Sequence, residues 1–282
     1  MLGHNSYGKS GIRLVKVTRR PDRHDLKDLT VAVRLEGDFE KAHAEGDNAA
    51  VLPTDTMKNT VYAFAAQRPL DPIEAFGLAL ARHFVDSHAP VSRASVEIVE
   101  HLWERLDPSG QPHRHAFRRA GEEKRVARIA LARTGAPSIE AGIDGLLILK
   151  TAQSGFSGFP RDRYTTLKET DDRILATALS AVWSYAGAEP SFNLLWRAIR
   201  QTLLETFADH ESRSVQHTLH AMGEAVLERH DEVARIHLTM PNKHHLSVDL
   251  APFGLSNENA IFVATEEPYG LIEATVERAS SA

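Results

Sequence analysis

The chain has 282 residues, of which 42% are hydrophobic and 25% charged, and its formal net charge is −5 at pH 7. This composition excludes a mostly disordered chain, and the acidic balance gives no general attraction for nucleic acid or anionic lipid. The absence of cysteine excludes disulfides, thiolate metal sites, iron–sulfur clusters and cysteine nucleophiles. No apolar run reaches the ~18 residues of a membrane helix, and the first residues lack the apolar core of a secretion signal. We therefore expect a cytoplasmic protein of one or two domains, with no membrane and no nucleic-acid partner.

Strand patterns dominate the first third of the chain. Apolar and polar residues mostly alternate over residues 12–17 and 31–35, as in half-buried strands. Residues 60–66 are predicted to form another strand after a polar loop. Strand signals return at residues 94–102 and 126–131.

Between these strands, one segment has the period of a helix. Four apolar residues are spaced three or four apart and predict its buried face: Ile73, Phe76, Leu80 and Phe84. Asp71 is a suitable N-cap, Pro72 suits the first turn, and Glu74 completes the pattern of a capping box.

The second half repeats this order. Residues 145–151 are typical of a buried strand, and the ambiguous segment 174–185 is interpreted as a strand as well. Two amphipathic helices follow, the second after a Ser214 cap, and their apolar stripes are Phe192, Leu195, Ile199, Leu203 and Phe207, then Val215, Leu219, Met222 and Val226. Strands are predicted again at residues 236–240, 246–250, 261–263 and 272–276.

The order strand–strand–helix–strand–strand therefore occurs twice. Adjacent strands joined by short turns, with helices between the pairs, indicate an antiparallel α+β fold. A turn at Gly135-Ala136-Pro137 suggests two modules, residues 1–136 and residues 137–282.

Common catalytic and cofactor motifs are missing. There is no Gly-x-Gly-x-x-Gly nucleotide signature, no P-loop and no Gly-x-Ser-x-Gly elbow, so a nicotinamide, flavin or ATP enzyme has no positive support. His244 and His245 would point to opposite faces of a strand, whereas His113 and His115 would share a face and leave a metal site open. Histidines at the surface or core edge are the commoner reading of all four.

Three polar loop segments are rich in reactive groups. They lie at residues 52–60, 156–173 and 240–244, between or before predicted strands. Each taken singly is as well explained by turn chemistry and solvated charge as by a site.

Together with residues 7–9, these segments resemble urate oxidase (uricase). The resemblance runs in collinear order from Tyr7 to about Glu277, and five short strings carry it: Tyr7-Gly8-Lys9, Thr54-Asp55-Thr56-x-Lys58-Asn59-Thr60, residues 164–170, Ser214-Val215-Gln216 and Pro241-Asn242-Lys243-His244. It implies tandem tunnelling-fold (T-fold) modules, which are antiparallel sheets with helices packed on one face. It also implies a homotetramer that encloses a tunnel, with each site shared between two subunits.

The resemblance also assigns roles to residues. It implies that Lys9, Thr54 and His244 handle protons, with Asp55 beside them. For substrate binding it implies a urate clamp of Arg173 and Gln216, with the ring of Phe156 stacked on the purine. The other substrate-binding residues that it implies are Leu167 and Val215, which line the pocket, Asn242 above the purine, and Thr54 and Asp55. The counterparts of Lys9, Thr54 and Asp55 come from the neighbouring subunit in this family.

Elementary chemistry agrees with these roles. Urate is planar, anionic and rich in carbonyl and N–H edges, which a guanidinium fork and a glutamine amide complement. A neighbouring lysine can accept the proton of the threonine hydroxyl, and a histidine can relay protons to or from water. Doubly deprotonated urate is electron-rich enough to reduce oxygen, so no metal and no cofactor is expected.

The expected reaction is urate + O2 + H2O → 5-hydroxyisourate + H2O2, in urate catabolism. Two alternatives stay open. One is another T-fold enzyme acting on a purine or pterin, with metal assistance through His113 and His115. The other is a purine-binding protein that kept the clamp but lost turnover. The chain ends in Ala279-Ser280-Ser281-Ala282, without a Ser-Lys-Leu-type peroxisomal signal, so cytoplasm is the expected compartment.

Overall fold

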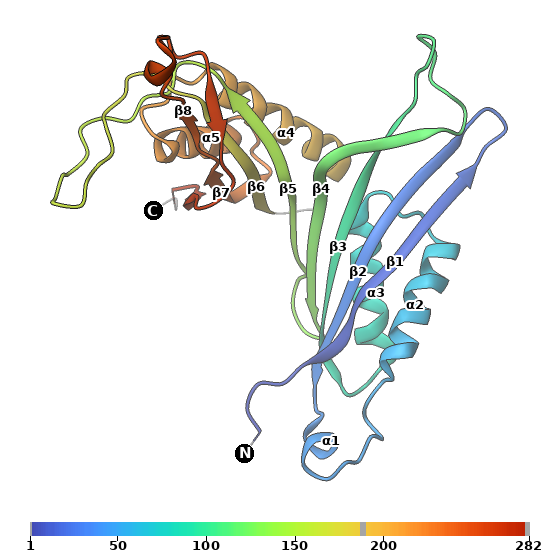
Figure 1. Cartoon of the computed structure of the whole chain (residues 1–282). Coiled ribbons are helices and arrows are strands. Elements are labelled where there is room, and N and C mark those ends of the chain that lie inside the picture. The colour runs from blue at the N-terminus through green and yellow to red at the C-terminus, as the bar shows by residue number, and fades with distance from the viewer. Residues whose placement is uncertain (1, 187–189, 280–282) are drawn as a thin grey trace. The chain divides into compact units, whose positions relative to one another are not determined.

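The computed structural model describes residues 2–186 and 190–279, which form two compact units (Figure 1). The first unit comprises Met1–Gly142 with Ser191–Asn193, and the second comprises Ile143–Pro190 with Leu194–Ala282. The boundary of the two predicted modules after residue 136 stays a prediction, because compactness alone does not define a module.

The first unit is a four-stranded sheet with two helices on one face. Its strands, in the order β1-β2-β3-β4, pair antiparallel throughout. Helix α2 packs on β1, and α3 packs on β3 and β4. The elements in chain order are β1 (Tyr7–Arg19), β2 (His24–Gly37), α1 (Glu40–Ala44), α2 (Thr54–Gln67), α3 (Ile73–Ser87), β3 (Val91–Arg105) and β4 (Phe117–Ala132).

The core of the first unit follows from the strand period of two. Alternate residues of β2 are almost fully buried, namely Leu29, Val31, Val33 and Leu35. They face the buried sides of the two helices, which include Met57 and Val61 of α2 and Phe76 and Phe84 of α3. The predicted strands at residues 12–17, 31–35, 94–102 and 126–131 are confirmed, although each is longer than the pattern indicated.

The predicted strand at residues 60–66 is wrong, because this segment belongs to helix α2. Its buried residues are Met57, Val61 and Ala65, which are four apart and lie on one helical face. The β-branched and aromatic residues of the segment suggested a strand, but packing of that face on β1 outweighs their propensity.

The helix predicted around Phe76 is confirmed as α3, but its capping box is wrong. The N-cap is Pro72, with no side-chain cap. The Asp71 carboxylate pairs instead with Lys27 at 3.1 Å, and the fully buried Glu74 accepts hydrogen bonds from Arg125 at 2.7 and 2.9 Å. Both carboxylates thus connect the helix start to the sheet.

The second unit repeats the plan with additions. Its strand order is β5-β6-β7-β10, with antiparallel pairing of β6 with β7 and of β7 with β10. Helix α5 packs on β7 and β10. The elements are β5 (Ser138–Lys150), which begins in the first unit, then β6 (Leu175–Tyr185), α4 (Phe192–Asp209), α5 (Val215–Arg229), β7 (Val233–Asn242), β8 (His245–Ser247), the short 3-10 helix η1 (Ala251–Phe253), β9 (Phe262–Ala264) and β10 (Gly270–Glu277).

Most predictions for this half are confirmed. The ambiguous segment 174–185 is strand β6, and both amphipathic helices are present. Ser214 caps α5, since its hydroxyl accepts a hydrogen bond from the His217 N–H at 3.1 Å. The strand predicted at residues 246–250 is wrong beyond Ser247, where the chain leaves a two-stranded hairpin with β9 and enters η1.

None of the helices in the described residues has the length and apolarity of a bilayer-spanning helix. Within the same residues, no three His, Cys, Asp or Glu side chains are grouped so that they could hold a metal ion.

Candidate active site

A hollow of about 550 Å³ in the second unit brings together residues from five segments of the chain. The segments are the loop between β5 and β6, the first turn of α5, the end of β7, the following β8–β9 hairpin, and β10. Seven predicted site residues line it, namely Phe156, Leu167, Arg173, Val215, Gln216, Asn242 and His244.

Short backbone contacts position the Phe156 ring. Phe156 and Thr170 exchange two backbone hydrogen bonds, at 2.7 and 3.1 Å. A side chain at Gly155 would meet the carbonyl oxygens of Thr170 and Asp171 at 3.1 Å, so glycine permits this close approach. The ring itself stacks on Phe159, with 5.0 Å between the centroids.

Arg173 lies over this ring and is half-buried. Its guanidinium carbon is 5.3 Å from the centroid of Phe156. The Nε atom is buried and has no hydrogen-bond partner among the described residues, and no carboxylate there forms an ion pair with Arg173. Burial lowers the pKa of Arg173, because it disfavours the charged form. A half-buried cation without a partner loses part of its hydration, and an anion in the hollow would offset that cost.

The first turn of α5 adds donors of two kinds. Val215 and Gln216 are its first two residues, and both line the hollow. Backbone N–H groups in the first turn have no partner within the helix, and the Ser214 hydroxyl satisfies the one on His217. The turn therefore favours an anion, and the Gln216 amide adds one donor and one acceptor.

The end of β7 places Asn242 and His244. Asn242 is 8% exposed and pairs with Gly270 of β10 and Thr177 of β6, so its backbone is held from both sides. The His244 carbonyl accepts two hydrogen bonds from Thr265, from the N–H at 2.9 Å and from the hydroxyl at 3.2 Å. Both His244 and His245 line the hollow, because β8 begins only at His245 and the opposite-face geometry of a strand does not apply to this pair.

The other three predicted site residues belong to the first unit. Lys9 is half-buried in β1, and Thr54 and Asp55 are the first residues of α2. The Asp55 carboxylate accepts a hydrogen bond from Lys58 and another from Asn59 at 2.9 Å. The hydrogen bond and charge of Lys58 are the main reason that the pKa of Asp55 lies below its ordinary value, and the charge of Lys9 adds to the effect.

A family model described as "Uricase" matches residues 5–130 and 139–273, which is most of the chain. The chain belongs to the uricase family. A uricase of Arthrobacter globiformis is 47% identical over 281 residues, covering 100% of this chain and 91% of the relative. A uricase of Aspergillus flavus is 39% identical, covering 97% of this chain and 96% of the relative.

Solved structures of this family share the fold. The crystal structure of uricase from Arthrobacter globiformis superposes with a TM-score of 0.94 and covers 100% of this chain and 96% of that one. The Bacillus sp. TB-90 urate oxidase is 23% identical and has a TM-score of 0.87, so the fold is common to much more distant chains. The predicted antiparallel sheet with helices on one face is therefore confirmed as the uricase fold.

Sequence reasoning missed several residues that line the hollow of this uricase-family chain. Most lie within three positions of a predicted residue, namely Lys168, Thr170, Asp172, Ile174, His245, Leu246 and Ser247. Asn259, Phe262 and Ile272 come from segments with no chemical signature of their own. A signal for Phe262 was the predicted strand at residues 261–263, but its partner β8 could not be identified from so short a pattern.

Proposed function

We propose that this chain is a cofactor-independent urate oxidase that converts urate, O2 and H2O into 5-hydroxyisourate and H2O2. The observation that carries the proposal is the half-buried guanidinium of Arg173, whose buried Nε has no hydrogen-bond partner among the described residues and which lies over the Phe156 ring. A flat anion is the ligand that such a pair recognises, because it can meet the cation at its edge and the ring at its face.

Urate matches the remaining groups of the hollow. The guanidinium of Arg173 donates to a carbonyl edge, and the Gln216 amide offers a donor and an acceptor to the neighbouring edge. Backbone N–H groups of the first turn of α5 favour the negative charge. The purine would stack on the Phe156 ring, which Phe159 and the Arg173 guanidinium also contact.

The chemical step needs a base and an oxygen site. In this proposal the Thr54 hydroxyl removes a proton from urate and passes it to Lys9, and His244 exchanges protons with water. The electron-rich urate dianion then reduces O2 to peroxide, and water adds to the oxidised ring. Asn242 holds oxygen or water above the purine.

The proposal requires at least two copies of the chain, arranged as a homotetramer that encloses a tunnel. Lys9, Thr54 and Asp55 belong to the first unit, whereas the hollow belongs to the second. We infer that these three residues complete the hollow of a neighbouring subunit. Isolated monomers are then inactive, and a monomer with turnover on size-exclusion chromatography would contradict the shared site.

The test is oxygen uptake by the full chain after chelator treatment, with urate as substrate and peroxide assayed in parallel. We expect uptake that is matched mole for mole by peroxide and unchanged by the chelator. Uptake that disappears on chelation would favour a metal-assisted enzyme. Tight urate binding by folded, tetrameric protein without any uptake would show a binding protein in place of an oxidase.

A further inference from the structure

The strands of the first unit are longer than the helices that cover them. A strand of 15 residues spans about 50 Å, whereas the 15-residue α3 spans about 22 Å. On the helix-facing side of β1 and β2, the apolar pair Leu14 and Leu29 is followed by Lys16 opposite Lys27 and Thr18 opposite Asp25. The face of the sheet thus changes from apolar to charged where the helices stop.

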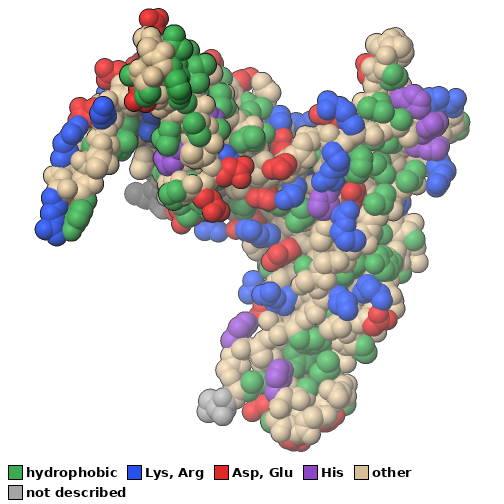
Figure 2. Space-filling model, in the orientation of Figure 1, with side chains coloured by type: hydrophobic (Ala, Val, Ile, Leu, Met, Phe, Trp, Pro, Cys, Tyr) green, Lys and Arg blue, Asp and Glu red, His purple; other side chains and the backbone are tan. Residues whose placement is uncertain are grey.

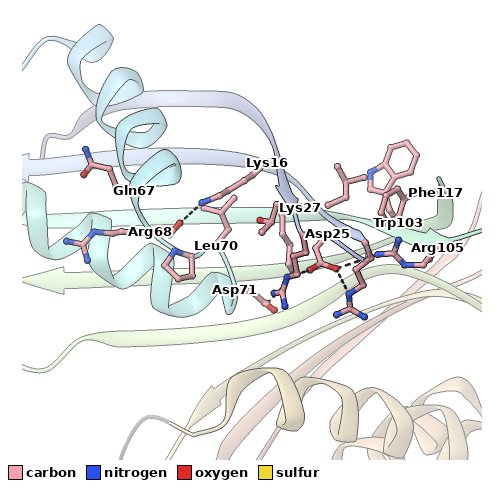
Figure 3. A pocket seen from close by; sticks show the side chains of 15 residues that line it. Lys16, Asp25, Lys27, Gln67, Arg68, Leu70, Asp71, Trp103, Arg105 and Phe117 are labelled. Atoms are coloured by element: carbon pink, nitrogen blue, oxygen red, sulfur yellow. Dashed lines mark hydrogen bonds and ion pairs between the residues drawn. The ribbon is translucent and has the colours of Figure 1, made fainter. Parts of the chain in front are cut away.

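This charged face forms one wall of a hollow of about 840 Å³, separate from the one described above (Figure 3). The turn between α2 and α3 forms the opposite wall, with Arg68, Leu70 and Asp71. Six cationic side chains line the hollow against two carboxylates, Asp25 and Asp71; the six are Lys16, Arg20, Arg23, Lys27, Arg68 and Arg105.

Three of these cations share a single carboxylate. Asp25 is 3.1 Å from Arg20, 3.3 Å from Arg23 and 3.5 Å from Arg105, measured between carboxylate oxygen and guanidinium nitrogen. Arg20 and Arg23 approach Asp25 through Nε, which leaves the donors on their terminal nitrogens to face other groups. One carboxylate cannot neutralise three guanidinium groups, so the hollow retains positive charge.

The walls of this hollow are fixed by backbone contacts. Arg105 donates to the carbonyls of His113 and Arg114 at 2.7 and 2.9 Å, and to the His24 carbonyl at 2.5 Å. The His24 N–H donates to the Arg114 carbonyl at 2.8 Å. The β1–β2 and β3–β4 hairpins are therefore joined where they turn, and Lys and Arg side chains gather with histidines there (Figure 2).

The helix side is anchored as well. The Lys16 ammonium donates to the carbonyls of Ala65 and Arg68 at 2.7 and 2.8 Å, at the end of α2. Lys27 lies between Glu100 at 2.6 Å and Asp71 at 3.1 Å. These two lysines and Arg105 are held by protein groups, and the Arg68 guanidinium lies over the Phe64 ring at 4.9 Å. The cations with the most open terminal nitrogens are Arg20 and Arg23, whose side chains are 57% and 54% exposed.

We propose that this hollow binds an oligophosphate anion, a ligand with two or more linked phosphoryl groups. Guanidinium groups match phosphate oxygens with paired hydrogen bonds, and two exposed arginines beside a third can hold adjacent phosphoryl groups. A ligand with only one carboxylate group would carry too little negative charge to balance the cations that line the hollow. The volume of the hollow lies in the range of ligand pockets, so a nucleotide that carries such linked phosphoryl groups also fits.

The test measures binding of sodium tripolyphosphate to the full chain at about 0.15 M salt, by calorimetry and by Trp103 fluorescence. Trp103 lines the hollow and is 38% exposed, whereas Trp183 and Trp196 are buried, so a change in emission reports on this site. The Arg20→Gln/Arg23→Gln variant removes the two open cations. The matched control, Arg19→Gln/Lys41→Gln, removes the same charge at exposed positions outside the hollow.

We expect saturable binding, with Kd raised about tenfold or more in Arg20→Gln/Arg23→Gln and nearly unchanged in the control. A parallel titration with ATP distinguishes a nucleotide from a free oligophosphate as the ligand. ATP that binds more tightly than tripolyphosphate would indicate a nucleotide. ATP that binds equally well would indicate that the site recognises the oligophosphate alone. No saturable binding to wild-type protein, or equal weakening in both variants, would overturn the proposal. So would a change of oligomeric state in Arg20→Gln/Arg23→Gln with binding intact, which would mark the hollow as a contact between copies. Retained urate oxidation in both variants shows that they fold.

Discussion

The two units share an order of elements but divide their residues differently between strands and loops. In the first unit the strands have 13 to 16 residues, and the helices on them have 14 and 15. In the second unit β6, β7 and β10 have only 11, 10 and 8 residues, beside helices of 18 and 15. Since a strand rises about twice as far per residue as a helix, only the first sheet extends well past its helices.

This difference decides where each unit offers a binding surface. The first unit has its hollow on the uncovered end of the sheet, and strand residues line most of it. The second unit covers its sheet and carries long connections at residues 151–174 and 243–269, which line its hollow with loop residues. One plan of strands and helices therefore carries two differently lined hollows, because strand length and loop length vary independently of it.

The largest expected effect shows whether the second unit alone suffices for urate oxidation. We expect Lys9→Met, in the first unit, to lower kcat about 10²–10⁴-fold with little change in KM, because a proton acceptor is lost and the clamp is kept. Steady-state oxygen uptake measures both constants. Lys41→Met, an exposed lysine of α1, is the matched control and should keep full activity. Full turnover by well-folded Lys9→Met would show that the first unit takes no part in the chemistry.

Arg173→Met tests the guanidinium of the second hollow, which forms no ion pair with the described residues. We expect kcat/KM for urate to fall about 10²–10³-fold, as for loss of a buried charged hydrogen bond to a ligand. The control is Arg161→Met in the same loop, whose side chain is 55% exposed and 3.8 Å from Glu169, so its loss should change little. Equal effects of the two substitutions would mean that Arg173 serves the loop and not the substrate.

Glu74→Gln tests whether the first unit has its own stability. The change leaves Arg125 without the buried carboxylate that it contacts at 2.7 Å, and we expect a loss of about 3 kcal/mol in the free energy of unfolding. Hydrogen exchange should show lower protection in residues 2–142 and little change in residues 194–279. Glu40→Gln, at an exposed position of α1, is the control. Equal loss of protection in both regions would show that the units unfold together.

The smallest expected effect concerns pH and is common to both units. Each contains two histidines whose pKa is lowered mainly by burial, His83 and His101 in the first, His210 and His230 in the second. A lowered folded-state pKa means that the unfolded chain binds more protons, so stability falls as pH drops through 6.5, the ordinary value, and below. In urea unfolding, His230→Gln should lose less stability than wild type between pH 7.5 and 5.5. An equal loss of stability in the variant and in wild type would show that His230 does not contribute to the pH dependence.

The sequence pattern predicts most elements of both units, because alternation and the helical period survive wherever one face of an element is buried. Helix α2 is the largest exception, since Val61, Tyr62 and Phe64 favour a strand locally and only packing on β1 decides otherwise. The capping box at α3 failed for a related reason. Asp71 forms an ion pair with Lys27, and Glu74 forms one with Arg125. These partners are distant in sequence, so a rule based on neighbouring residues does not predict them.

The candidate site could be predicted only in part from the residues themselves. The loop at residues 156–173 and the Ser214 cap were evident locally, but nothing in a single sequence brings them to the end of β7. The family resemblance supplied that connection, and seven of its residues do line one hollow. The hollow in the first unit had no such guide. Its cations are scattered from Lys16 to Arg105 and come together only through the register of β1 with β2 and the turns of two hairpins.

The position of β10 has a consequence for the timing of synthesis. This strand follows every other described element in the chain, yet it pairs with β7 at Asn242 and contributes Ile272 to the second hollow. The strands of the first unit are complete once residue 132 has left the ribosome. At ordinary rates of translation, β10 emerges on the order of ten seconds later. A nascent chain therefore acquires its cationic hollow well before it can close the proposed urate site, and a chain interrupted in that interval would carry the first without the second.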